Sequence, residues 1–151
     1  MARPKPTAPP GAPPASPDEI EQQFYEALQQ GDIERLMAVW SDDEEISCVH
    51  PGGPRVVGAG AIRAAFESIF ANGAVNAQPE KVRRLQTHAC AVHSVLEHIR
   101  MMTAEGPQSG WVIATNVYVL GAQGWRLVSH HASPGSPREA QEIVEAASVL
   151  H

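Results

Sequence analysis

The sequence has few basic residues and no long apolar run, and each shortage excludes a class of partner. Its 151 residues include 11 Lys and Arg against 17 Asp and Glu, giving a formal net charge of −6. Nucleic-acid-binding domains carry clustered basic surface, whereas these basic residues are scattered, so nucleic acid is not an expected partner. No apolar run approaches the roughly 20 residues of a membrane-spanning helix, so no membrane association is expected.

Residues 1–17 lack the apolar core of a secretory signal, which predicts a soluble, cytoplasmic protein. They hold seven of the 13 prolines. Such a composition buries little apolar surface, so we expect a disordered tail up to residue 17. The tail is either an inert leader, which we favour, or a docking ligand for another protein.

Cysteine is also scarce. The only two, Cys48 and Cys90, fall in predicted strands and match no C-x-x-C pattern. This favours buried free thiols over a disulfide or a metal pair, and nothing indicates a redox enzyme.

The patterns in the rest of the sequence fit one domain over residues 18–134, and this domain begins with helices. The segment Ser16-Pro17-Asp18-Glu19 forms a capping box, and the helix that follows is expected to end at Gly31. Asp32 then caps a second predicted helix that reaches Trp40. A third is expected after Gly58. The apolar positions predicted for these helices are Ile20, Phe24, Ala27, Leu28, Ile33, Leu36, Met37, Trp40, Ile62, Ala65, Phe66, Ile69 and Phe70.

Strands are predicted over residues 44–49, 80–92, 94–104, 111–121 and 125–133. A second capping box at Ser136 predicts a C-terminal helix within residues 135–151, with Ile143, Ala147 and Leu150 on one side. Helices followed by long strands favour an α+β fold. We expect a cone-shaped, curved antiparallel sheet wrapped around three N-terminal helices, plus the C-terminal helix.

Several short motifs, in this order, resemble a known superfamily. They are Gly31-Asp32, Trp40-Ser41-Asp42-Asp43, His50-Pro51-Gly52, Gly58, Thr115-Asn116-Val117, Trp125-Arg126-Leu127 and His130-His131. Over residues 18–134 the chain resembles the nuclear transport factor 2-like superfamily, and within it the SnoaL-like group related to ketosteroid isomerases. The resemblance implies a pocket between the helices and the concave sheet face. It also implies a homodimer formed through the outer sheet face.

Ketosteroid isomerases use an aspartate base together with a tyrosine and a protonated aspartic acid that stabilise an enolate oxygen. The resemblance puts His50 at the base, Asn116 at the protonated acid and Phe24 at the tyrosine. Trp40 and Phe66 fall where supporting tyrosines often lie. Since the hydroxyls of that network are absent, the steroid isomerase activity is rejected. His50, with an ordinary pKa of about 6.5, and the Asn116 amide remain as a weak base and donor.

Strand alternation decides which other polar groups are expected in the pocket. Glu97 shares a face with Val95, Ile99 and Met101, so we favour it over His98. On the last strand Arg126, Val128 and His130 are grouped together. The resemblance to the superfamily implies that His130 points inward and His131 outward, although one bulge would exchange them.

The predicted site thus contains His50, Glu97, Asn116 and His130. Its walls are Phe24, Trp40, Phe66, Val112, Ala114 and Tyr118. A purely structural explanation stays open, in which His50 closes a turn, Glu97 pairs with a histidine and the aromatic residues are core. Several ionisable groups on one enclosed face favour function, because buried charge is costly unless paired or used. No H-x-x-x-H or H-E-x-x-H spacing supports a metal site, so none is expected.

The leading hypothesis is a lyase, isomerase or cyclase, working without a cofactor, in which His50 is the general acid/base on a small apolar carbonyl compound. The alternative is a non-catalytic homodimeric module for ligand binding or association. A third hypothesis is an interaction protein that acts through its proline-rich tail.

Overall fold

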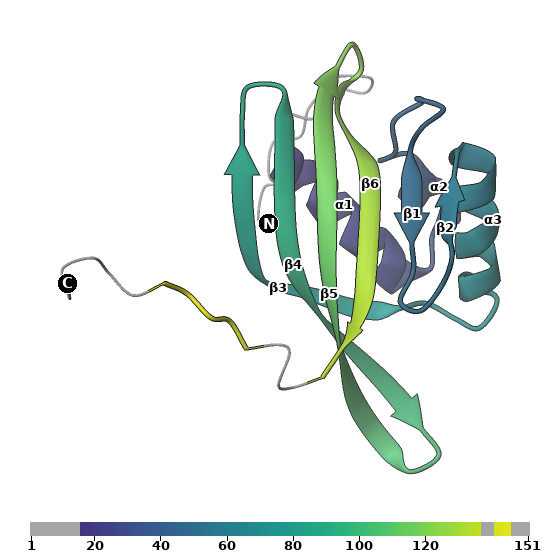
Figure 1. The fold of residues 1–151 in the computed structure, drawn as a ribbon. Helices are drawn as coiled ribbons and strands as arrows, with labels where there is room; N and C mark the ends of the chain where they lie inside the picture. Colours follow the sequence, from purple (N-terminus) through teal and green to yellow (C-terminus); the bar gives the residue numbers. More distant parts are fainter. Residues whose placement is uncertain (1–15, 137–140, 146–151) are drawn as a thin grey trace, which may run out of the picture.

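A computed structural model describes residues 16–136 and 141–145 of the protein. Helices lie against one face of a curved, six-stranded sheet, with α1 crossing behind its middle strands (Figure 1). The elements are α1 (Pro17–Gln30), α2 (Ile33–Met37), β1 (Ser47–Val49), β2 (Arg55–Val57), α3 (Ala59–Phe70), β3 (Asn76–Gln86), β4 (Cys90–Thr103), β5 (Gly106–Gly121) and β6 (Gly124–Gly135). The expected α+β class is confirmed.

Helix α1 begins and ends where the sequence predicts. The Ser16 hydroxyl accepts a hydrogen bond of 3.2 Å from the backbone N–H of Glu19, and Pro17 occupies the first turn. Gly31 ends the helix in the left-handed conformation (φ 65°), which glycine adopts without steric cost.

Helix α2 is shorter than predicted. It ends at Met37, and Trp40 instead forms an isolated parallel bridge to Leu127. Backbone hydrogen bonds join Leu127 N–H to the Val39 carbonyl at 2.8 Å and Ser41 N–H to the Leu127 carbonyl at 2.9 Å. The chain leaves the helix early because β6 supplies partners for these backbone groups.

The sheet order is β2-β1-β6-β5-β4-β3, and the expectation of an entirely antiparallel sheet is wrong at one pair. Strand β1 runs parallel to β6, with Cys48 opposite His130. Parallel neighbours need a long crossover, which the chain from β2 to β5 provides. The sheet stays open, with β2 and β3 as its edges, so it curves over α1 without closing. Strand β2 was not predicted.

The predicted break between the strands at 80–92 and 94–104 is also wrong, because His93 lies inside β4. The turn occurs at residues 87–89. There the Thr87 hydroxyl accepts a hydrogen bond of 3.1 Å from the backbone N–H of Cys90, and Thr87 N–H bonds to the Cys90 carbonyl at 2.8 Å. A threonine side chain closes this turn without glycine or proline.

Strands β4 and β5 extend beyond both of their neighbours. Pairing with β3 ends at Arg100, and pairing with β6 begins at Trp111. Residues 101–110 therefore project as a two-stranded hairpin, as Figure 1 shows at the lower end of the sheet. Met101 and Met102 on this hairpin are 47% and 79% exposed.

The described part of the predicted C-terminal helix is not helical. Residues 141–145 form no helix, and Ile143 is fully exposed. An amphipathic helix is stabilised mainly by packing its apolar face, and Ile143 has no such packing. Residues 137–140 and 146–151, including Ala147 and Leu150, lie outside the described residues, as do residues 1–15 of the predicted tail.

The buried side chains lie between the helices and the concave face of the sheet. Both cysteines are free, as the sequence predicts, but only Cys48 is buried as expected, and Cys90 is half-buried. Across residues 16–136 and 141–145, none of the helices has the length and apolar character needed to cross a bilayer.

Candidate functional site

A cavity of about 230 Å³ lies between the concave face of the sheet and helix α3. Its lining residues come from helices α1 and α3, from strands β4, β5 and β6, and from the segments that follow β1 and α3. The residues are Leu28, His50, Pro51, Phe66, Ile69, Val75, Glu97, Ile99, Val112, His130 and Ala132. Most are apolar, and three ionisable groups converge in it, which is typical of a binding site for a small ligand.

The structure brings some of the predicted site residues to this cavity and places the others behind it. His50, Glu97, His130, Phe66 and Val112 line it. Asn116, Phe24, Ala114, Tyr118 and Trp40 are buried but do not line it. His50 directly follows β1, and its ring meets Phe66 edge-on with centroids 4.7 Å apart.

Alternation along β4 places Glu97 inward and His98 outward. Glu97 is 5% exposed, while His98 stacks on Trp111 with ring centroids 4.4 Å apart. On β6, His130 is buried and His131 exposed.

The grouping of Arg126, Val128 and His130 on one face is wrong. A register shift between Val117 and Tyr118 of β5 leaves Val128 of β6 as an extra residue. Beyond this bulge the inward positions are Leu127 and Trp125. The bulge reverses the alternation, so His130 shares the interior with Leu127 rather than with Arg126.

Hydrogen bonds connect Glu97 and His130 through two buried residues. The Tyr25 hydroxyl donates to Glu97 Oε2 at 2.7 Å and accepts from the Asn116 amide nitrogen at 3.1 Å. Asn116 Oδ1 lies 2.5 Å from His130 Nδ1. Because an amide oxygen only accepts, His130 carries its proton on Nδ1 and presents an unprotonated Nε2.

This Nε2 lies 4.0 Å from Glu97 Oε2. The separation exceeds a direct hydrogen bond, and both groups line the same cavity. A polar ligand atom placed between them can contact both. Asn116 thus orients His130 from behind and does not offer its own amide to the cavity, contrary to its predicted role as a donor.

Glu21 of helix α1 joins the buried polar network and accepts several of its hydrogen bonds. Its Oε2 accepts hydrogen bonds from the Tyr118 hydroxyl at 2.6 Å, His93 Nδ1 at 2.9 Å and the Asn116 amide at 3.3 Å. Three donors on one carboxylate oxygen compensate for the burial of its charge. The Asn116 amide nitrogen faces this carboxylate, which fixes the orientation of the amide described above.

Burial shifts the pKa values of the cavity groups in opposite directions. It raises the pKa of Glu97 to about 7; the Tyr25 hydrogen bond partly opposes this rise, and the charge of Glu21 adds to it. Burial is the main cause that lowers the pKa of His130 to about 3, and electrostatic interactions with the neighbouring His50 and His131 add to this effect. Burial also lowers the pKa of His50. Near neutral pH the cavity therefore holds neutral imidazoles and a carboxyl that exchanges its proton readily.

The sequence interpretation missed Glu21, Tyr25 and His93. It placed Phe24 at the oxyanion tyrosine and took the network hydroxyls as absent, yet Tyr25, the next residue, puts a hydroxyl on Glu97. The signal was present: Glu21 and Tyr25 are four positions apart, so they share one side of α1 and flank Phe24. His93 was missed because the strand break was placed beside it.

Phe24 and Trp40 do not line the cavity, but Phe24 contacts a residue that does. The Phe24 ring packs on His130 with centroids 5.0 Å apart. Trp40 pairs with the start of β6, and its buried Nε1 has no hydrogen-bond partner among the described residues.

Asp18, Glu21 and His93 have possible metal-ligand atoms within 4.8 Å of one another. Arg84 already pairs with Asp18 at 2.8 Å, and Glu21 Oε2 is engaged by its three donors. We interpret this group as a hydrogen-bonded cluster rather than a metal site.

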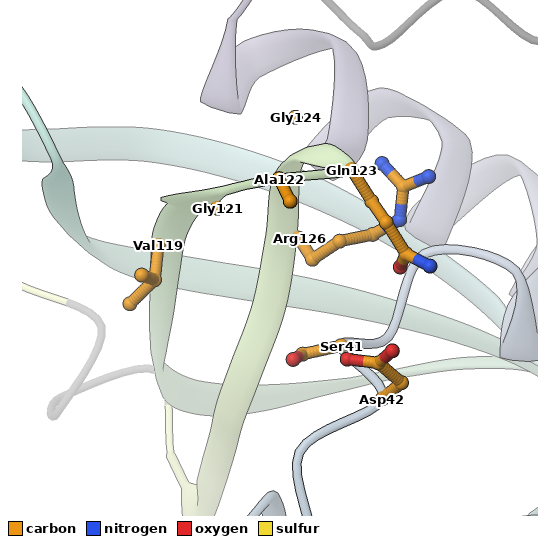
Figure 2. A pocket seen from close by; sticks show the side chains of 8 residues that line it. All are labelled: Ser41, Asp42, Val119, Gly121, Ala122, Gln123, Gly124 and Arg126. Atoms are coloured by element: carbon orange, nitrogen blue, oxygen red, sulfur yellow. The ribbon is translucent and has the colours of Figure 1, made fainter.

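A separate pocket of about 210 Å³ lies at the β5–β6 turn. Figure 2 shows Arg126 and Gln123 on one side of it and Ser41 and Asp42 on the other. None of its lining side chains is a buried ionisable group. The cavity around Glu97 is therefore the better candidate for chemistry.

Comparison with known proteins agrees with this fold. Residues 18–137 match a family described as SnoaL-like domain. A proposed calcium/calmodulin-dependent protein kinase type II association domain from Thiobacillus denitrificans is 32% identical, with a TM-score of 0.74 over 85% of this chain and 100% of that chain. A proposed dehydratase of the NTF2-like family from Streptomyces avermitilis is also 32% identical, with a TM-score of 0.70 over 78% of this chain and 92% of that one.

A Caulobacter vibrioides protein with a cystatin-like fold is 17% identical, with a TM-score of 0.69 over 82% of this chain and 89% of that chain, and shows the fold alone. No curated protein matches the sequence.

Proposed function

Because the chain belongs to the SnoaL-like domain family of the NTF2-like superfamily, we propose that its cavity binds a small uncharged carbonyl compound and catalyses proton transfer on it. The observation that carries the proposal is that Glu97 lines one mostly apolar cavity together with the neutral imidazoles of His50 and His130. A carboxyl with a pKa of about 7 is close to the best match for general acid–base catalysis at neutral pH.

The reaction class we favour is the elimination of water from a β-hydroxy carbonyl compound. His50 accepts the proton from the carbon next to the carbonyl, a carbon–carbon double bond forms, and the hydroxyl leaves as water with a proton donated by Glu97. His130 Nε2 accepts a hydrogen bond from the substrate and orients it. The 32% identity to the proposed dehydratase supports this class over isomerisation or cyclisation.

The cavity also limits the charge of the substrate. Neither Lys nor Arg lines it, so a carboxylate or phosphate would lie beside Glu97 with no cation to balance it. An uncharged substrate avoids this cost. We therefore propose that the reacting part of the substrate carries no formal charge.

The test is a panel of uncharged β-hydroxy ketones, with conjugated product followed by ultraviolet absorbance. The protein should release the conjugated ketone, and Glu97→Gln or His50→Ala should lower the rate by about 100-fold or more. His98→Ala is the matched control, because His98 stacks on Trp111 outside the cavity. Equal rates for the protein and Glu97→Gln, or no turnover and no binding across the panel, would contradict the proposal.

A second function, a homodimeric association module, is favoured by the 32% identity to the proposed association domain. The outer face of β5 carries half-buried Trp111, Ile113 and Val117, which would pack against a second copy. Light scattering should then give the mass of a dimer, and Ile113→Glu should give that of a monomer. A monomeric parent protein would exclude this function.

A further inference from the structure

The cavity at Glu97 adjoins a larger one beneath the β4–β5 hairpin. This outer cavity has a volume of about 500 Å³. Its lining residues are Ile69, Asn72, Gly73, Ala74, Val75, Asn76, Ile99, Arg100, Met101 and Met102. Ile69, Val75 and Ile99 line both cavities, so the two cavities are adjacent and have these three side chains on their common border.

Resting on the proposed function, we infer that the two cavities form one elongated site and that the substrate carries a linear aliphatic chain. The reacting end of the substrate lies in the inner cavity, with its hydroxyl against Glu97 and His130. The chain passes Ile69, Val75 and Ile99 and lies along Met101 and Met102. The inner cavity selects the reacting group, and the outer cavity selects the length of the chain.

The apolar side chains along this path are incompletely covered by the protein. Ile69, Val75 and Ile99 are half-buried, although they pack against the core. Met101 and Met102 are 47% and 79% exposed on a hairpin that neither β3 nor β6 extends to cover. Together they form a continuous apolar path from the inner cavity to the surface, and exposed apolar surface of this kind marks binding sites.

Methionine suits this role because its unbranched, polarisable side chain adapts to ligands of different shape. The polar side chains that line the outer cavity, Asn72, Asn76 and Arg100, are all exposed to solvent. An aliphatic chain would cover the apolar floor and leave these polar groups in water.

The test measures binding of straight-chain methyl ketones, from butanone to undecan-2-one, by isothermal titration calorimetry. Butanone fills only the inner cavity and reports on the proposed function. For longer ketones, each added methylene should raise the affinity by about two- to fourfold until the outer cavity is full. Affinity that does not change with chain length, with butanone still bound, would overturn the elongated site and leave the proposed function standing.

The matched variants are Met101→Ala/Met102→Ala and Leu85→Ala. The double variant should lower the affinity for undecan-2-one by about tenfold and leave the affinity for butanone unchanged. Leu85 is 73% exposed on β3 and lines neither cavity, so Leu85→Ala should change neither affinity. A double variant that binds undecan-2-one normally, or whose only defect is loss of a dimer, would contradict the inference. Failure to bind any ketone would overturn the proposed function and this inference with it.

Discussion

The Tyr25 hydroxyl donates a hydrogen bond of 2.7 Å to Glu97 Oε2, although the two residues are 72 positions apart in the chain. This bond connects helix α1 to strand β4 on the concave face of the sheet (Figure 1). It also stabilises the charged form of a carboxyl whose burial favours the neutral form. Tyr25 is thus a positioning residue that holds Glu97 at the cavity and limits the rise of its pKa.

Tyr25→Phe is expected to raise the pKa of Glu97 above about 7, because the hydrogen bond that opposes the effect of burial is lost. It should also lower the free energy of unfolding by about 1–3 kcal/mol, since the Asn116 amide loses an acceptor. Urea unfolding and carbon NMR of the labelled Glu97 carboxyl measure the two effects.

The control for Tyr25→Phe is Tyr118→Phe, which removes the same atom from a tyrosine bonded to Glu21 rather than to Glu97. It should lower stability without removing the direct bond to Glu97. A Glu97 pKa that falls in Tyr25→Phe, or stays where it was, would refute the role given to Tyr25.

Glu97 should make the protein less stable as the pH rises. Its ordinary pKa is 4.5 and its folded value is about 7, so the folded state holds the proton more tightly. The stability that this provides is fully present below pH 4.5 and is lost as the pH rises through about 7. The loss amounts to about 3 kcal/mol. Urea unfolding measured across this pH range should show no such loss of stability in Glu97→Gln. An identical pH dependence of stability in both proteins would count against the burial of the carboxyl.

His130 should make the protein less stable as the pH falls. Its pKa falls from 6.5 to about 3, so the folded state binds its proton less tightly than the unfolded chain does. The stability that depends on the neutral imidazole is fully present above pH 6.5 and is lost as the pH falls through about 3. In His130→Gln, acid unfolding should begin at lower pH than in the parent protein. Unchanged acid sensitivity would mean that His130 is not buried in its neutral form.

The two cysteines should differ in reactivity. Burial, with a contribution from the charge of Glu97, raises the pKa of the Cys48 thiol to about 12, so almost no thiolate forms at neutral pH. Cys90 is half-buried at the start of β4. Mass spectrometry after brief iodoacetamide treatment should find Cys90 alkylated and Cys48 intact. The same experiment in urea should label both, and preferential labelling of Cys48 in the folded protein would be inconsistent with this structure.

Local signals in the sequence were sufficient for much of the fold. The capping residue Ser16 and the stop at Gly31 define α1, because each satisfies or terminates backbone hydrogen bonds by a local rule. The inward placement of Glu97 follows from alternation on β4, where no bulge intervenes around it. These features depend on near neighbours in the chain.

Features that depend on distant partners could not be predicted in this way. The parallel pairing of β1 with β6 joins residues 82 positions apart, as in the Ser47–Ser129 pair. The bulge at Val128 is visible only in the register against β5. The bond from Tyr25 to Glu97 likewise requires knowing that α1 crosses β4. Nothing in a single sequence fixes these relationships.

The central claim is that Glu97 is a proton-exchanging carboxyl within a ligand cavity, and a carbon NMR titration of its side chain tests this most directly. Glu97→Gln identifies the resonance by its absence. The structure predicts a midpoint near pH 7 that moves when butanone occupies the cavity. A midpoint at 4.5, unmoved by butanone, would show an ordinary carboxyl and contradict the claim.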